Sequence, residues 1–478
     1  MPADTQPGLP ASGRHYLWMT AGVAALGGLL FGYDTAVISG AIEPLRTDFG
    51  LSAAEKGWAA GSALVGCVPG VLLAGILADR CGRKLALLVA ALLFFISAVG
   101  TAVPQTFTQF VIFRAVGGVA VGIASITSPM YIAEISPAGL RGKMVSLNQL
   151  AIISGMLVVY FVNYGIALLG DDAWLVTSGW RWMFASEALP ALLLLGLLFA
   201  VPESPRFLCR TGRHDRARSI LARIGGGAWA DEELARIESA PGHEAGPWRD
   251  LLGPGLRVAL LVGIALAILQ QVTGINVFLY YAPDIFRSMA GATTDVALLQ
   301  TIIVGAVNLT FTVAAILTVD RLGRRPLMLI GAAGMGISLC AIGAAAWGQA
   351  VGNWLLVFVL GYIACFAMSV GPVTWVILSE IFPTRLRGRA LGVATFFLWT
   401  ANYLVSQTFP MMAENEWLLA RFQGGFPFFV YGAFCVVLVA LVARFVPETK
   451  GRTLEEIESF WRPRDRVGQR GHDNNHPH

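Results

Sequence analysis

The chain has 478 residues, of which 56% are hydrophobic and only 13% are charged. Soluble globular domains carry roughly a quarter charged residues, so this composition excludes a soluble protein and indicates a chain that crosses a membrane many times. The net charge of +4 is small. The basic residues lie in short clusters beside apolar runs, a pattern that reflects membrane topology and argues against nucleic-acid binding.

A polar leader, residues 1–15, comes first. The apolar segment that follows is too long for the core of a signal peptide and lacks a clear cleavage site, so we expect it to remain as the first span. Apolar runs of about 20 residues, the length that crosses a bilayer, recur along the chain. They predict twelve spans, at residues 16–40, 57–79, 84–104, 107–131, 144–167, 182–201, 256–282, 296–319, 325–347, 353–379, 389–412 and 424–446.

The two halves of the chain repeat. Three motifs of the first half return at nearly the same spacing in the second: 79–84 as 320–325, 134–143 as 380–389, and 202–203 as 447–448. We therefore predict an all-α membrane protein whose twelve transmembrane helices form two six-helix repeats, the layout of a transporter that works by alternating access. The expected parts are the leader, the halves 16–201 and 255–446, a cytoplasmic linker 202–254 and a tail 447–478.

The polar segments between and after the halves carry helical signals. In the linker, Leu208, Ile220, Leu221 and Ile224 have a helix-like spacing, which predicts short amphipathic helices. In the tail, Thr453 and Glu456 form a possible capping box. Lys and Arg gather in alternate loops, which predicts that both termini are cytoplasmic. These basic residues are Arg80, Arg83, Lys84, Arg141, Lys143, Arg321, Arg324, Arg325, Arg385, Arg387 and Arg389.

Three charged residues fall inside predicted spans of the first half. Asp34 is the only charge between Tyr16 and Ile42, and an ionisable group at that depth is costly, which makes it a functional-site hypothesis. An acid that snorkels to the interface is the alternative, but Asp is too short to reach water from there. Arg114, alone between residues 85 and 133 at a similar depth, is its expected partner. Glu187 is a third candidate, or else an interfacial residue beside Trp180 and Trp182.

The second half contains no charge in the interior of a predicted span, and it carries uncharged polar groups instead. Gln270, Thr273, Asn276 and Tyr280 form one helical stripe. Amides that both donate and accept, beside aromatic faces, suit a neutral, hydroxyl-rich solute; bonds between helices are the alternative role. Burial favours a neutral carboxyl and a nearby guanidinium favours a charged one. A rocking motion that separates Asp34 from Arg114 would therefore bind and release a proton, as in a symporter.

Charged residues also recur in the cytoplasmic motifs. Ion pairs between acids and bases of different halves would hold the cytoplasmic side shut and favour an outward-open state; a simple excess of positive charge inside is the alternative. The residues of this expected gate are Asp79, Arg83, Glu134, Arg141, Glu203, Asp320, Arg324, Glu380, Arg387 and Glu448.

Five motifs together resemble the sugar porter family of the major facilitator superfamily: Gly75–Lys84, Pro202–Arg206, Gln270–Asn276, Gly371–Trp375 and Pro447–Gly451. Within the family the resemblance is strongest to the bacterial proton-coupled xylose symporters. It implies that Asp34 is the proton-coupling acid, with Arg114 its partner and Glu187 an accessory acid. The implied sugar contacts are Phe31, Gln149, Gln270, Gln271, Asn276, Tyr280, Asn308, Gly371, Trp375 and Trp399.

Three positions depart from those symporters. Met156 and Leu398 stand where they have sugar-contacting Gln, and Val370 stands where they have Trp. Because two lost hydrogen bonds could change the preference among sugars, the expected substrate is xylose or a hexose such as glucose or galactose.

The remaining expectations follow from the same features. The chain has no phosphate-binding loop and no metal-like cysteine spacing, so we expect no ATP, no cofactor and no enzymatic activity. We expect a monomer in a bacterial inner membrane that carries a monosaccharide with H⁺. A facilitative uniporter and a sugar sensor that does not transport are the alternatives.

Overall fold

The structure, a computed structural model, describes residues 10–239, 248–253, 256–291, 293–382 and 386–450. These residues form helices and connecting loops and contain no strand. The capping box predicted at Thr453 lies outside the described residues.

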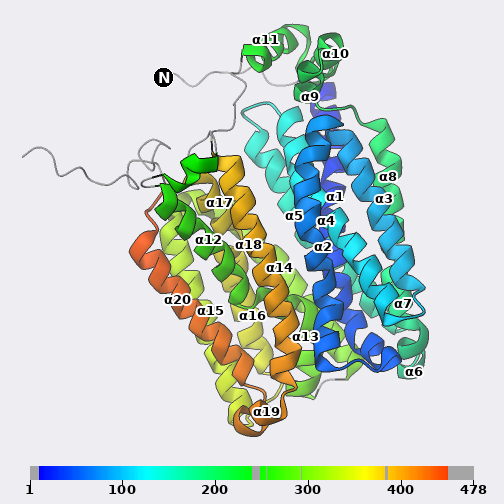
Figure 1. The fold of residues 1–478 in the computed structure, drawn as a ribbon, viewed down its shortest axis with the longest axis vertical. Coiled ribbons are helices and arrows are strands. Elements are labelled where there is room, and N and C mark those ends of the chain that lie inside the picture. The colour runs from blue at the N-terminus through cyan, green and yellow to red at the C-terminus, as the bar shows by residue number, and fades with distance from the viewer. Residues whose placement is uncertain (1–9, 240–247, 254–255, 292, 383–385, 451–478) are drawn as a thin grey trace, which may run out of the picture.

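Helices of residues 11–200 form one bundle and helices of residues 256–445 form the other (Figure 1). The first bundle contains α1 (Ala11–Phe49), α2 (Ala53–Arg80), α3 (Arg83–Ala102), α4 (Phe107–Ile135), α5 (Arg141–Ala167), α6 (Asp172–Trp174), the π-helical turn η1 (Leu175–Gly179), α7 (Trp180–Ala185) and α8 (Ala188–Ala200). The second contains α12 (Leu256–Val272), α13 (Ile275–Ala290), α14 (Thr294–Leu322), α15 (Arg324–Trp347), α16 (Leu355–Met368), α17 (Val370–Glu380), α18 (Arg387–Ala413), α19 (Glu416–Phe422) and α20 (Phe426–Phe445).

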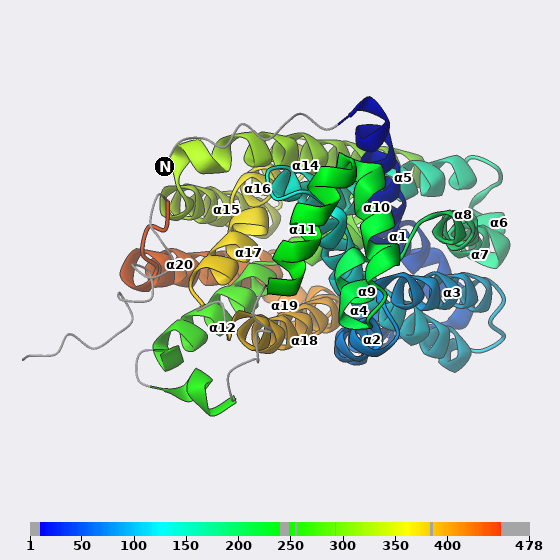
Figure 2. The same cartoon turned by 90° about the horizontal axis from the view of Figure 1, so that it is seen from above.

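Short helices lie between the bundles in sequence: α9 (Pro205–Arg210), α10 (His214–Gly225), α11 (Gly227–Ser239) and the 3-10 turn η2 (Trp248–Leu252). Figure 2 shows α9–α11 across one end of the molecule. As the spacing predicts, Leu208, Ile220, Leu221 and Ile224 are buried. We call this end the inner face, and the opposite end, which carries α6 and α19, the outer face (Figure 1).

The predicted spans correspond to helices, but several boundaries are wrong. Eleven helical segments of the described chain are long and apolar enough to cross a membrane. The twelfth is α18, of 27 residues, whose polar side chains make it less apolar. The first span was predicted to end at residue 40, yet α1 continues to Phe49. The seventh was predicted to end at residue 282, yet α13 continues to Ala290.

Two breaks interrupt spans of the second bundle where polar groups gather. Gly274 joins α12 to α13 with a φ of 96°, and a Cβ there would lie 2.8 Å from the Tyr431 ring, so only glycine fits. Ser369, with φ −132° and ψ −86°, joins α16 to α17. The breaks place the ends of four helices in the middle of the bundle, where backbone groups become free to bind.

Small residues bring the helices around Asp34 together. A Cβ added at Gly32 would lie 1.8 Å from the backbone oxygen of Ile152, and one at Gly118 would lie 1.8 Å from that of Ala63. Close approach through glycine is typical of membrane helix pairs. It holds α1 against α5 and α2 against α4.

Candidate functional site

A buried acid–base pair lies in the middle of the first bundle. Asp34 of α1 and Arg114 of α4 are 0% and 1% exposed. The Arg114 Nη1 donates to Asp34 Oδ1 at 2.9 Å and to the Asp34 backbone oxygen at 3.0 Å. A Cβ at Gly117 would lie 2.9 Å from Asp34 Oδ1, so glycine makes room for the carboxyl. The predicted contact is therefore present.

Glu187 adds a second acid to this pair. It lies between α7 and α8, is 1% exposed and interacts with the Asp34 carboxyl. The alternative of an interfacial residue is wrong, because the chain turns at Glu187 and leaves Trp182, not Glu187, at the surface. Asp34 Oδ2 and Glu187 Oε1 find no hydrogen-bond partner among the described residues. One proton shared by the two carboxyls would satisfy both oxygens.

A chain of amides lies at the breaks of the second bundle. Gln270 Nε2 donates to the Gly371 backbone oxygen at 2.9 Å. Gln271 Nε2 donates to Gln270 Oε1 at 3.4 Å, and Asn276 Nδ2 donates to Gln271 Oε1 at 2.5 Å. The predicted stripe is thus also a network between helices. Thr273 is not part of it, since its hydroxyl bonds the Gln270 backbone.

Aromatic side chains from both bundles stand beside each other. The Phe31 ring of α1 lies 5.9 Å from the Trp399 ring of α18, centroid to centroid. Trp399 Nε1 is buried and has no hydrogen-bond partner in the described part of the chain. Tyr280 is buried and interacts with Asn402. A buried donor without an acceptor is unfavourable, so the indole N–H is available to a solute between the bundles.

Other predicted contacts are more scattered. Asn308 is buried in α14, and Gly371 is half-buried. Gln149 is exposed on α5, and Trp375 is 41% exposed on α17, so the structure does not bring them into the amide network. At the three departing positions, Leu398 and Val370 are buried and Met156 is half-buried beside Gly32.

The expectation that the seventh span carries no charge in its interior is wrong, because the helix extends beyond the predicted end of that span. Asp284 lies on α13, two residues beyond the predicted end of the seventh span, and its Oδ2 is 2.8 Å from the Nζ of Lys56 on α2. Lys56 is 5% exposed. Hydropathy falls at Pro283 and Asp284, so the predicted span ends before them. Neither Asp284 nor Lys56 was therefore predicted as a functional residue. The available signal was a base and an acid at matching depth in different halves.

In this structure, the inner-face acids and bases pair on one side of the molecule and do not form the predicted gate between halves, which therefore stays a prediction for the outward-open state. Arg83 pairs with Glu134 at 2.9 Å, and Arg324 with Glu380 at 3.1 Å. Arg210 pairs with Asp79, and the Arg141 guanidinium donates to the Ala133 backbone oxygen. Each of these contacts stays on one side of the molecule. Nothing is described of the Asp320 side chain, and Arg387 is half-buried.

Glu203 and Glu448 occupy equivalent places in the two repeats. Glu203 accepts from the backbone N–H groups of residues 83 and 84, at the first turn of α3, and Glu448 accepts from those of 324 and 325, at the first turn of α15. Helix N-termini attract carboxylates. Burial raises the pKa of Glu203; at Glu448 the backbone donors outweigh burial and lower its pKa.

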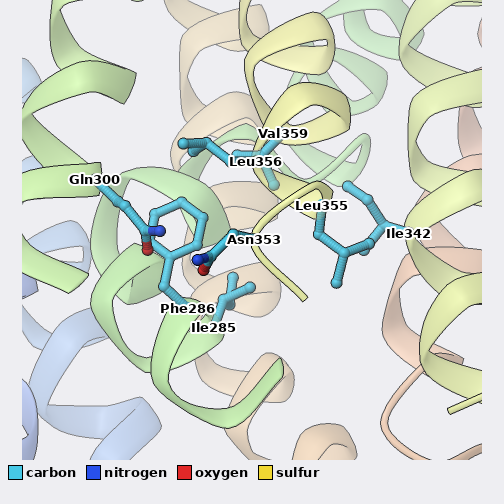
Figure 3. Close-up of a pocket in the computed structure, with 8 residues that line it drawn as sticks. All are labelled: Ile285, Phe286, Gln300, Ile342, Asn353, Leu355, Leu356 and Val359. Carbon is cyan, nitrogen blue, oxygen red and sulfur yellow. The ribbon is translucent and has the colours of Figure 1, made fainter. Parts of the chain in front are cut away.

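A cavity between α13 and α16 is not a substrate site. It has a volume of about 10 Å³ and is lined by apolar side chains with Gln300 and Asn353 (Figure 3). That space holds about one water molecule.

Two membrane-spanning bundles, with a buried carboxyl pair in one and a neutral, amide-rich site in the other, define a transporter of the alternating-access class. A family model described as "Sugar (and other) transporter" matches residues 20–461, and the chain belongs to this family. The resemblance to sugar porters is thereby confirmed.

Characterised relatives are similar over nearly their whole length. The D-xylose-proton symporter of Escherichia coli (strain K12) is 51% identical, over 95% of this chain and 97% of that one. The arabinose-proton symporter of Bacillus subtilis (strain 168) is 41% identical, over 96% and 99%.

Solved structures agree on the fold. The inward open conformation of the xylose transporter XylE from E. coli matches with a TM-score of 0.83 and 47% identity, over 93% of this chain and 100% of that chain. XylE bound to 6-bromo-6-deoxy-D-glucose matches with a TM-score of 0.79 and 50% identity, over 94% and 99%.

Proposed function

We propose that this protein imports a monosaccharide together with a proton by alternating access. The observation that carries the proposal is the buried Asp34, held by Arg114 on one oxygen and interacting with the Glu187 carboxyl. The proton-coupled relatives for xylose and arabinose support it.

The proton is carried by the carboxyl pair. With Asp34 ionised, the Arg114 guanidinium offsets its charge in the bundle. A proton shared between the Asp34 and Glu187 carboxyls removes one of their two negative charges, which weakens the attraction between α1 and Arg114 of α4. Because α1 also contacts the second bundle through Phe31 and Trp399, a shift of α1 transmits the protonation state to the sugar site.

The sugar is held by neutral groups. Gln270, Gln271 and Asn276 offer donors and acceptors for hydroxyls, and Trp399 offers its N–H and an aromatic face. Xylose and hexoses both fit this chemistry. Met156 and Leu398 offer no hydrogen bond, so these positions set the preference among sugars.

Alkalinisation of a lightly buffered medium tests the coupling. We expect the external pH to rise when sugar is added to de-energised cells that express the protein. Sugar uptake without a pH change would identify a facilitative uniporter. Sugar binding without counterflow in proteoliposomes would identify a sensor.

We further propose that the protein works as a monomer in the inner membrane, with both termini cytoplasmic. Its proposed domains are the two six-helix halves, 16–201 and 255–446, joined by the cytoplasmic linker 202–254. It needs neither ATP nor a cofactor and catalyses no chemical reaction. The alternate loops rich in Lys and Arg support the orientation.

A further inference from the structure

Five charged side chains meet at the outer face, where the two bundles touch. We call them the outer latch: Glu43 and Arg46 of α1, Lys56 of α2, Asp284 of α13 and Glu414 at the end of α18. The first three belong to the first bundle and the other two to the second. The amide site and the Asp34 pair do not include them.

The ion pairs of the outer latch cross between the bundles. Lys56 Nζ lies 2.8 Å from Asp284 Oδ2 and 3.5 Å from Glu414 Oε1. Arg46 bonds both oxygens of Glu414, at 2.8 and 2.7 Å. Lys56 also contacts Glu43 within its own bundle. Two bases and one acid of the first bundle therefore face two acids of the second, and the net charges are opposite.

The latch is largely removed from water. The side chains of Lys56 and Asp284 are 6% and 15% exposed, and those of Glu43 and Glu414 are 26% and 27% exposed. Taking one partner from a buried ion pair leaves the other charge buried without compensation. Asp284 and Glu414, whose partners in the latch lie in the first bundle, thus depend on the bundles being in contact.

Tight packing surrounds the latch and shows that the outer face is closed. A Cβ at Gly57 would lie 2.5 Å from the backbone oxygen of Gln407, whose Nε2 donates to the Ala54 oxygen at 2.8 Å. The next residue of α2, Trp58, packs edge to face against Tyr403. A cavity of about 150 Å³ borders Glu43 and Asp284, so water reaches one side of the latch.

We propose that Lys56 and its partners are functional residues for transport, because they stabilise the outer-closed state and set how often the carrier opens outward. When the bundles separate, Lys56 keeps Glu43 but loses Asp284 and Glu414. The resulting energy difference between the two states governs the return of the empty carrier. This inference rests on the proposed alternating access.

The test measures the separation of the bundles directly. Spin labels go on Thr108→Cys and Ala420→Cys, which are exposed on the outer face of different bundles. The chain is full-length, with its six cysteines replaced by serine. Distances are measured by electron resonance in liposomes, without sugar or a proton gradient. We expect Lys56→Met to raise the ratio of long to short distances about tenfold or more.

A double variant distinguishes charge coupling from loss of packing. Lys56→Met/Asp284→Asn removes one charge of each sign, and we expect its distances to lie closer to those of the parent than those of Lys56→Met. The matched control is Arg181→Met, because Arg181 pairs with Asp48 inside the first bundle; its distances should equal the parent's.

Two results would overturn the latch: distances in Lys56→Met equal to the control's, or a double variant that is more open than Lys56→Met. A failure of the proposed sugar transport can be distinguished from a failure of the latch. If the distances shift as expected but no variant, parent included, takes up sugar, the latch stands and sugar transport does not.

Discussion

A single carboxyl carries the proposed coupling, and its surroundings explain why substitution should uncouple transport without preventing it. In Asp34→Asn the amide still fits beside Gly117 and still accepts from Arg114, but it cannot bind and release a proton. We expect sugar accumulation in energised vesicles to fall to about onefold, the equilibrium ratio of an uncoupled carrier. Counterflow should persist. A mutant that still concentrates sugar would refute the role of Asp34.

Substitution of Arg114 is expected to affect the stability of the protein. Arg114→Met leaves Asp34 and Glu187 without a base, and removing one partner of a buried pair costs roughly 3–5 kcal/mol of stability. Arg114→Met/Asp34→Asn removes both charges and should recover most of the loss. Thermal unfolding in detergent measures both variants. A loss in the double variant equal to the sum of the losses in Arg114→Met and Asp34→Asn would show that the two residues do not interact.

Sugar preference is expected to depend on two apolar residues. Met156→Gln and Leu398→Gln each add one hydrogen-bonding group, worth on the order of 1 kcal/mol, or about fivefold in affinity. We expect the double variant to favour xylose over hexoses more than the parent does. A competition panel of pentoses and hexoses against purified protein measures the change; an unaltered ranking would place specificity elsewhere.

The helix breaks contribute to sugar binding because they position the polar side chains beside them. At Gly274 an added methyl group meets both a left-handed backbone and the Tyr431 ring. Gly274→Ala should cost about 1–2 kcal/mol of stability and weaken sugar binding, because the break aligns Gln271 with Asn276. Titration by intrinsic tryptophan fluorescence and thermal unfolding test these effects.

A second alanine variant provides the comparison. Gly165 lies inside α5 with ordinary helical geometry and no atom near its added Cβ. Gly165→Ala should leave binding unchanged and not reduce stability. If both variants behaved alike, the break at Gly274 would have no special role.

Hydropathy locates spans well because the bilayer demands long apolar runs, and all twelve were found. It locates their ends poorly. Between Glu43 and Phe49, and again after Pro283, helices continue although the sequence becomes polar, because tertiary ion pairs satisfy the charges. The outer latch was therefore invisible to an argument that treated charge as the end of a span.

At the scale of the molecule, internal repetition was the strongest sequence signal, and it predicted two bundles of six helices. Depth arguments also predicted the contact between Asp34 and Arg114. They could not place Gln149 or Trp375, whose exposure depends on how the bundles are tilted. Nor could they decide which acids and bases pair, since Arg83 has several acids within reach and only folding selects Glu134.

Glu203 and Glu448 each join two distant segments of their own bundle. Each follows the sixth span of its repeat and binds the first turn of the third, beside Gly82 or Gly323, whose positive φ opens the space. In each repeat, the end of the sixth span is thus hydrogen-bonded to the start of the third span. A bundle fastened in this way can pivot as one rigid piece, so the motion is concentrated in the seam between the two.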